Sequence, residues 1–213
     1  MIQPKNLAAA FAFVGLLTTS GIAKADPKLY VEVGAMWANP GDTAAEFTTE
    51  NTGAIWDLSE MAGGKLQIGA DFGSVRAEGK FRVLQGDVDA ISGGVTGVTS
   101  VTNGEGPDAA LGVATFNIYW DISDIKAGDE AAVTPYVGVG VGVARGFMQA
   151  EGTLGGQIRE DHRTEEGTAL TGAVGALFSI NEKIGITAEY EYIDIDFGGL
   201  DVHSASLGLR LSF

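Results

Sequence analysis

Apolar side chains occupy every second position through most of this chain. In residues 28–37, Val33 and Trp37 share one face, whereas Glu32 falls on the opposite face. A period of two is the spacing of side chains that point to one side of a β-strand. The same alternation recurs in seven further segments, at residues 65–73, 74–83, 114–121, 134–147, 170–180, 183–197 and 203–213. The sequence therefore predicts eight strands, most of them about ten residues long, close to the length that a tilted strand needs to cross a bilayer.

The two faces of these strands differ in chemistry. One face is apolar and almost free of charge, and the other combines ionised residues of both signs with many of the 32 glycines. A soluble exported β-sandwich would also alternate and is the alternative fold, but a lipid-facing wall around an ionisable interior is the pattern of a membrane barrel. We predict an all-β fold, an eight-stranded antiparallel up-and-down transmembrane β-barrel.

The predicted connections alternate in length. Long polar loops at residues 39–63, 87–107 and 150–166 follow the first, third and fifth strands, whereas Gly73-Ser74 and Asn181-Glu182-Lys183 are tight turns. Long loops outside and short turns in the periplasm are typical of outer-membrane barrels. One irregularity interrupts the pattern: apolar residues change parity after Tyr192, which predicts a β-bulge there.

Residues 1–25 have the pattern of a secretory signal peptide. Lys5 precedes an apolar run from Leu7 to Leu17, and Ala23-Lys24-Ala25 offers a cleavage site between small residues. The run is shorter than the ~20 residues of a membrane helix, which disfavours an uncleaved anchor. We therefore predict a signal peptide at 1–25 and one barrel domain at 26–213.

Composition excludes several functions. The formal charge is −15, and loss of the two signal-peptide lysines without any acid would take it to −17. Such a chain is a poor partner for nucleic acid. With no cysteine there is neither a disulfide framework nor thiol chemistry. No phosphate-binding or zinc motif occurs, so we expect no cofactor and no metal.

Ionised residues on the inner faces form the main candidate site. Unpaired charges inside a narrow barrel would be very costly, so we expect an interlocked network of ion pairs and hydrogen bonds. Glycines 138, 140 and 142 would leave room for long Arg and Lys side chains. A polar core that holds the barrel shut is favoured over a gated ion path, because eight strands leave little free bore. The expected lumen network comprises Glu32, Asp71, Arg76, Glu78, Lys80, Arg82, Asp121, Glu189, Glu191 and Arg210.

Aromatic residues are expected to form girdles at the two membrane interfaces. The predicted periplasmic girdle contains Phe72, Tyr119, Trp120, Tyr136, Phe178 and Phe213, and the outer one contains Trp37, Phe147, Tyr190 and Tyr192.

The signal peptide, the eight amphipathic strands, the segment TPYVGVGVGVA and the ending LGLRLSF together resemble the small OmpA/opacity-type outer-membrane barrels of Gram-negative bacteria. The resemblance implies an outer-membrane location among lipid and lipopolysaccharide. It also implies that the alternating C-terminal strand is an assembly signal for the barrel-assembly machinery, carried by Leu207, Leu209, Leu211 and Phe213.

Two histidines invite catalytic or metal-binding interpretations. His203 lies near Asp201, Ser204 and Ser206, but His203 and Ser206 fall on opposite faces of one strand, which argues against a triad. His162 lies in REDHRTEE, where a solvated charge run is favoured over a weak divalent-ion site.

The outside loops remain as the functional surface. The first loop is acidic around a short apolar knot, through Glu46, Glu50, Ile55, Trp56, Asp57, Leu58 and Glu60. We expect a non-enzymatic monomer that serves envelope integrity or adhesion to a host or neighbouring cell. A narrow ion or small-solute channel is the alternative, and a lipid-modifying enzyme is less favoured.

Overall fold

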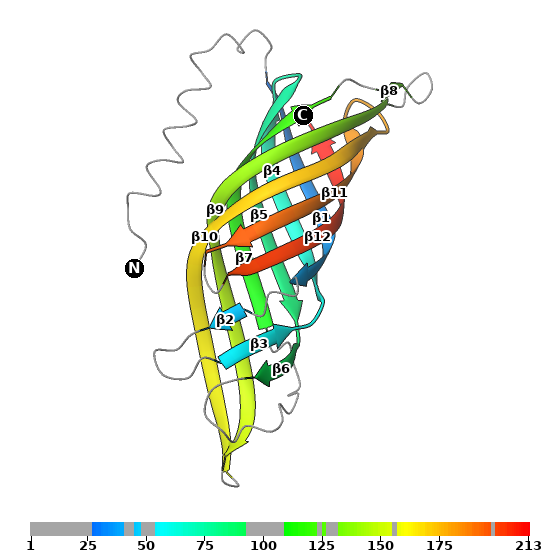
Figure 1. Cartoon of the computed structure of the whole chain (residues 1–213). Coiled ribbons are helices and arrows are strands. Elements are labelled where there is room, and N and C mark those ends of the chain that lie inside the picture. Colours follow the sequence, from blue (N-terminus) through cyan, green and yellow to red (C-terminus); the bar gives the residue numbers. More distant parts are fainter. Residues whose placement is uncertain are drawn as a thin grey trace.

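The computed structural model describes residues 27–40, 45–47, 54–92, 109–122, 125–126, 132–154, 157–196 and 199–213, nearly all of them in strands (Figure 1). The predicted signal peptide at 1–25 lies outside these residues. Within the described ranges, no helix has the length and apolar character that a membrane crossing requires.

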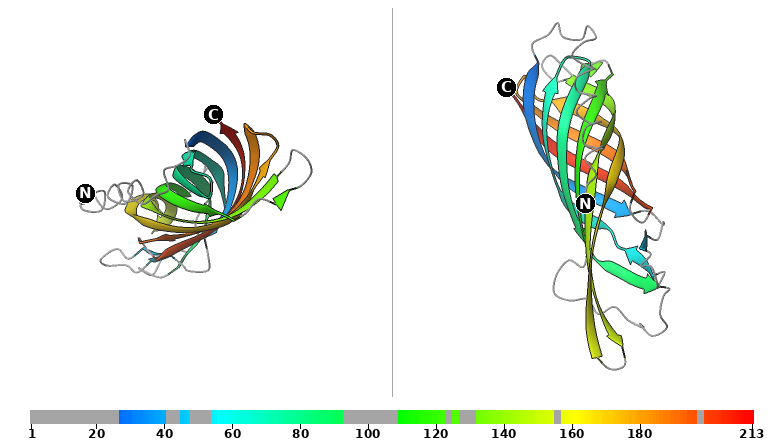
Figure 2. Two further views of the ribbon diagram at one scale, coloured as in Figure 1. Left: turned by 90° about the horizontal axis from the view of Figure 1, so that it is seen from above. Right: turned by 90° about the vertical axis from the view of Figure 1, so that its left-hand side faces the viewer.

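Eight long strands close into an antiparallel barrel. Their order is β10-β11-β12-β1-β4-β5-β7-β9, and β9 pairs back with β10 to close the cylinder, whose curved wall is visible from above (Figure 2). This confirms the predicted fold. The strands are β1 (Lys28–Pro40), β4 (Met61–Asp71), β5 (Val75–Gly86), β7 (Ala109–Asp121), β9 (Ala132–Leu154), β10 (Gln157–Ser179), β11 (Ile184–Ile195) and β12 (Leu200–Ser212).

Four short strands accompany the barrel. One small sheet contains β2 (Ala45–Phe47), β3 (Ala54–Leu58) and β6 (Val88–Ser92), and β8 (Ile125–Lys126) pairs with the edge of β9. Pairing between these short strands satisfies backbone N–H and C=O groups that would otherwise hydrogen-bond to water.

The barrel has a turn end and a loop end. At the turn end, the amide of Phe213 donates to the carbonyl of Leu29 at 2.8 Å, and Gly73 takes a left-handed φ of 97° between β4 and β5. Asn181 Oδ1 closes the β10–β11 turn by accepting hydrogen bonds from the next amides, including that of Lys183 at 2.9 Å. The longer connections begin and end at the opposite, loop end. The predicted alternation of long and short connections therefore holds for most of the barrel.

One predicted loop is instead a hairpin. Within the expected charged loop at 150–166, residues 150–154 continue β9 and residues 157–166 belong to β10, so that each strand has 23 residues and Leu154 lies opposite Gln157. This arm extends beyond the rest of the barrel at its loop end (Figure 1). The apolar alternation that identifies half-buried strands is absent from its polar sequence, so the pattern could not reveal it.

The predicted bulge at Tyr192 is also wrong. β11 pairs with β12 without a shift in register, from Tyr192 opposite His203 to Ile195 opposite Leu200. Ile193 and Ile195 are fully buried, so the apolar side chains there point into the barrel. What changes at this level is the chemistry of the lumen and not the geometry of the strand.

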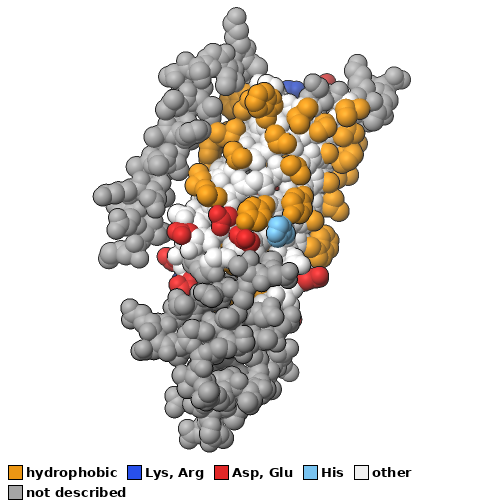
Figure 3. Space-filling view, viewed as in Figure 1, with side chains coloured by type: hydrophobic (Ala, Val, Ile, Leu, Met, Phe, Trp, Pro, Cys, Tyr) orange, Lys and Arg blue, Asp and Glu red, His pale blue; other side chains and the backbone are white. Residues whose placement is uncertain are grey.

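An apolar plug fills the loop end of the lumen. Outside it the wall carries exposed acids such as Asp194 and Asp196, and acidic side chains begin where the apolar ones stop (Figure 3). Facing water, this part of the wall turns its polar residues outward and its apolar ones inward, as a soluble barrel does. The plug consists of Met36, Ala38, Met61, Leu84, Ala109, Leu111, Val113, Ala144, Met148, Ala169, Ile193, Ile195, Leu200 and Val202.

The switch from outward-facing apolar residues to outward-facing acids predicts that the outer wall contacts lipid along one part and water along the other. Because the chain lacks cysteine, a spin label can be attached to a single introduced thiol. A label at Leu209 should be relaxed by oxygen dissolved in lipid, and one at Asp194 by a nickel reagent dissolved in water. Electron paramagnetic resonance in bilayers measures both. An Asp194 label shielded from nickel would show that the strand slips as the bulge requires.

Candidate functional site

Six strands place ten charged residues in the lumen between the turn end and the apolar plug. Strict alternation along β1, β4, β5, β7, β11 and β12 turns them inward, and the side chains of Glu32, Arg82 and Glu191 are nearly inaccessible to solvent. We refer to them as the charged lumen, which comprises Glu32, Lys65, Arg76, Glu78, Lys80, Arg82, Asp121, Glu189, Glu191 and Arg210.

The middle of the charged lumen is organised around two acids of β11. Lys80 Nζ lies 2.7 Å from Glu189 and 3.3 Å from Glu191. Arg82 reaches Glu191 with two nitrogens, through Nε at 2.8 Å and a short contact from Nη2, and donates from Nη1 to Thr115 at 2.9 Å. Bidentate pairing of this kind is among the strongest polar contacts in proteins.

A second group surrounds Glu32 of β1. Its carboxylate accepts hydrogen bonds from Arg210 at 3.0 and 3.1 Å, pairs with Lys65 at 3.0 Å, and accepts from the Thr187 hydroxyl at 2.6 Å. Lys65 also approaches Glu189 at 3.5 Å and so joins this group to the middle one.

The third group lies nearest the turn end. Arg76 pairs with Asp121 at 2.9 Å and with Glu78 at 3.1 Å, and Glu78 accepts a short hydrogen bond from Tyr30. Arg210 contacts Glu78 at 3.4 Å and thereby links this group to Glu32. The three groups form one continuous network across the barrel.

The network is electrically balanced, with five cations facing five carboxylates. Desolvation of each ion costs several kcal/mol, and only close pairing and hydrogen bonding repay that cost. The excess negative charge of the chain therefore lies elsewhere, on the outer surfaces and the connections.

The structure brings nine of the ten expected residues together in this network and differs from the expectation in two places. Asp71 accepts a hydrogen bond from the amide of Gly73 at 2.7 Å, so it caps the β4–β5 turn and forms no ion pair among the described side chains. Lys65 belongs to the network but was missed, because it is the first residue of the predicted strand at 65–73, whereas β4 begins earlier, at Met61. Lys65 lies two residues before Gln67 and therefore on the same inward face of the strand, and this spacing could have identified it.

Two tyrosines expected in the periplasmic girdle point into the lumen instead. Tyr119 and Tyr136 are almost fully buried, and their rings meet edge to face with centroids 5.4 Å apart. Arg76 stacks over both rings, and Lys80 donates to the Tyr119 hydroxyl at 2.5 Å. A tyrosine side chain suits both the membrane interface and a polar lumen, so the strand face on which it lies determines where it points.

The inward glycines of β9 accommodate these neighbours. A Cβ at Gly138 would overlap the Tyr119 ring, and one at Gly140 would overlap the Asn117 amide. The expectation that this glycine column makes room for Arg and Lys is therefore wrong, since the room is filled by an aromatic ring and an amide.

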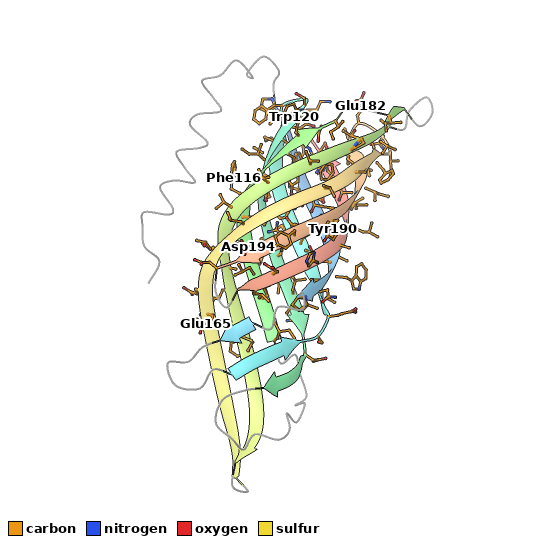
Figure 4. The ribbon with its side chains drawn as sticks, in the orientation of Figure 1. Phe116, Trp120, Glu165, Glu182, Tyr190 and Asp194 are labelled. Atoms are coloured by element: carbon orange, nitrogen blue, oxygen red, sulfur yellow. The ribbon has the colours of Figure 1, made fainter. Side chains whose placement is uncertain are left out.

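Other aromatic residues face outward as expected. Trp120 lies near the turn end, whereas Asp194 and Glu165 lie toward the loop end (Figure 4). Trp120 and Phe213 are among the most exposed apolar side chains, and Trp37 is exposed on β1. Of the other aromatic residues expected in the girdles, Phe147, Phe178, Tyr190 and Tyr192 also face outward, and Phe72 is half-buried.

The surroundings of His203 do not form a triad. The ring is exposed on the outer wall, where Nδ1 lies 2.6 Å from the Tyr190 hydroxyl, and it packs beside Tyr192. Ser204 and Ser206 are buried in the lumen on the other side of the strand.

The remaining sequence candidates fall in different places. Leu58, expected in an apolar knot of the first loop, packs against the apolar plug, and Glu60 is exposed. Among the described residues, no group of three His, Asp or Glu side chains is placed to hold a metal. The side chains of Glu46, Glu50, Ile55, Trp56, Asp57 and His162 lie outside the described part.

The solved structures that resemble this chain include small outer-membrane barrels. Neisserial surface protein A is 16% identical with a TM-score of 0.54, over 87% of this chain and 97% of that one. OprG from Pseudomonas aeruginosa is 14% identical with a TM-score of 0.54, over 88% and 96%. At these identities the likeness concerns the fold alone. A search of curated proteins gave no match.

A closed eight-stranded barrel with an apolar wall and an ion-paired lumen is the architecture of a bacterial outer-membrane protein. The sequence profile described as the outer membrane protein beta-barrel domain matches residues 9–213. The chain belongs to this family, which indicates a location in the Gram-negative outer membrane.

The charged lumen predicts large costs for breaking single pairs. Arg82→Met should lower the free energy of unfolding by about 3–5 kcal/mol, because it leaves Glu191 buried with an incomplete set of partners. Urea titration in lipid vesicles measures the change. Arg145→Met is the matched control: its pair with Glu166 is exposed at 3.5 Å and should contribute no more than about 1 kcal/mol. Equal effects of the two variants would contradict the role of the lumen pairs.

The close fit around Tyr119 gives a second prediction. Gly138→Ala should destabilise the barrel by about 1–3 kcal/mol, because the added methyl overlaps the ring. Gly172→Ala is the control, since nothing lies within 4 Å of its Cβ, and it should change stability by less than about 1 kcal/mol. The same titration compares them, and a tolerated Gly138→Ala would show that the ring moves freely.

Proposed function

We propose that the protein is a sealed, non-enzymatic and monomeric anchor that presents its extracellular segments for contact at the cell surface. In this proposal residues 1–25 direct export and are removed. The outward residues Leu207, Leu209, Leu211 and Phe213 then serve as the signal for the barrel-assembly machinery. All four are exposed on the wall, as contact with such a partner requires.

The filling of the lumen supports this proposal most directly. An ion pathway would have to cross the charged lumen and then the apolar plug, where Leu84, Val113 and Ile193 are completely buried. The cavity beside Met61 and Leu111 measures about 20 Å³, room for about one water molecule. An apolar constriction of this kind opposes the passage of ions.

Charge indicates what kind of surface the anchor would meet. The segments 41–60, 87–108, 145–166 and 194–201, which lead to and from the loop end, hold 17 acidic residues against three arginines. Such a field attracts cationic surfaces and repels polyanions. The partner proposed here is therefore a basic patch on a host or neighbouring-cell protein.

The charged lumen also supports a second candidate, a narrow ion or small-solute channel. Ionised groups of both signs line its wall, and among the described side chains the buried Gln67 Oε1 lacks a hydrogen-bond partner. Rearrangement of the pairs around Glu189 would have to open both the charged lumen and the plug.

Planar-bilayer recording distinguishes the two. The sealed anchor should give no steady conductance in the wild type. Steady openings that change when Arg82 or Glu189 is neutralised would establish the channel instead. The weaker enzyme alternative has its own readout, since lipid A from expressing cells would gain or lose an acyl chain and His203→Ala would abolish the change.

The surface role predicts selective, salt-sensitive adhesion. Proteoliposomes carrying the protein should bind a surface coated with a basic protein and not one coated with heparin, and added salt should weaken the binding. Neutralising Glu60, Asp87 and Asp194 should reduce binding, whereas neutralising Glu182 in the periplasmic turn should not. Unchanged binding by the first variant would refute a charge-driven contact.

A further inference from the structure

A groove of about 740 Å³ crosses the outer wall over β5, β7, β9 and β10. Small side chains of β7, including Ala110, Gly112 and Ala114, line it together with the larger Phe81 and Val143 of the adjacent strands. The difference in side-chain size makes an apolar depression in a wall that faces hydrocarbon. A depression of this shape and chemistry can hold an acyl chain.

Charged groups lie at the loop-end side of the same groove. Arg145, Glu166 and Asp196 line it there with Thr168. The Thr168 hydroxyl donates to Asp196 Oδ2 at 3.2 Å, and the amide of Asp196 donates to the Thr168 carbonyl at 3.0 Å, which fixes the carboxylate near β10.

Arg145 is available to a ligand. Its Nε lies 3.5 Å from Glu166, but the two side chains are 69% and 47% exposed, so the pair is solvated and weak. Among the described Lys and Arg side chains, the others lie in the lumen or near the turn end. An anionic group at this level of the wall therefore has one described cation to meet.

The charge count selects the headgroup. One guanidinium and two carboxylates carry a net charge of −1, which repels a lone phosphate but matches a group that holds both a phosphate and an ammonium. We propose that the groove binds a lipid that carries a phosphoethanolamine group. The phosphate pairs with Arg145, the ammonium donates to Glu166 and Asp196, and one acyl chain lies over Ala114 on β7. The site rests on the membrane location of the barrel and not on the sealing of its lumen.

Native mass spectrometry of the detergent-purified protein tests the headgroup. The probes are phosphatidylethanolamine, phosphatidylcholine, which lacks N–H donors, and phosphatidylglycerol, which lacks the cation. Phosphatidylethanolamine should be retained about tenfold more than either phosphatidylcholine or phosphatidylglycerol, because only its ammonium group can donate charge-assisted hydrogen bonds to the two carboxylates. Arg145→Gln should weaken retention of phosphatidylethanolamine, and Glu166→Gln with Asp196→Asn should abolish its advantage over phosphatidylglycerol. Lys183→Gln and Asp194→Asn are the charge controls outside the groove.

A variant of the apolar floor tests the acyl-chain position. Ala114→Leu fills the groove from the outer face and should reduce retention of all three lipids. Ala205→Leu adds the same bulk to the exposed face of β12 and should leave retention unchanged. Equal retention of the three probes by the wild type would overturn the proposal, as would retention insensitive to Arg145→Gln and Ala114→Leu. The folded state of each variant is checked by its heat-modifiable gel migration.

Discussion

Closure of the barrel through β1 and β12 is the constraint on which the rest of the structure depends. Hydrocarbon offers no partner for backbone N–H and C=O groups, so a sheet can cross it only if no edge remains open. The eleven residue pairs from Tyr30–Ser212 to Pro40–Val202 remove both edges at once. Closure then encloses a narrow space that must be filled, and each inward side chain has to find its partners among the others.

The solvent outside the wall decides how that space is filled. Where the wall meets lipid, the apolar faces turn outward, and the charged residues left inside are stabilised by one another and by neighbouring hydroxyl groups such as that of Thr187. Beyond Tyr190 and Tyr192 the wall meets water, and the same alternation places Ile193 and Ile195 inside and Asp194 outside. The charged lumen and the apolar plug are thus two results of one strand geometry in two environments.

This explains how far the sequence could be interpreted. Alternation identified all eight membrane-crossing strands and nine of the ten charged-lumen residues, because parity alone determines which face a residue joins. It did not reveal the 23-residue β9 and β10, whose polar arm lacks a buried face and hence the signal. The parity change at Ile193 was interpreted as a bulge, because one uniform solvent was assumed along the wall. Asp71 and Tyr119 show the remaining limit: turn capping and ring packing depend on neighbours that only the folded barrel brings together.

The division of charge follows from the same geometry and bears on function. Five cations balance five carboxylates inside, so the lumen adds little to the field around the molecule. The net charge of −15 is therefore expressed on the outside, mostly in segments that lead to and from the loop end. The interior is filled and carries no net charge, whereas the field of the acidic exterior acts over about 8 Å at physiological salt. This division of charge supports the proposed surface role, because an approaching molecule would meet the acidic exterior first, and passage through the interior would require breaking the contacts that keep the barrel folded.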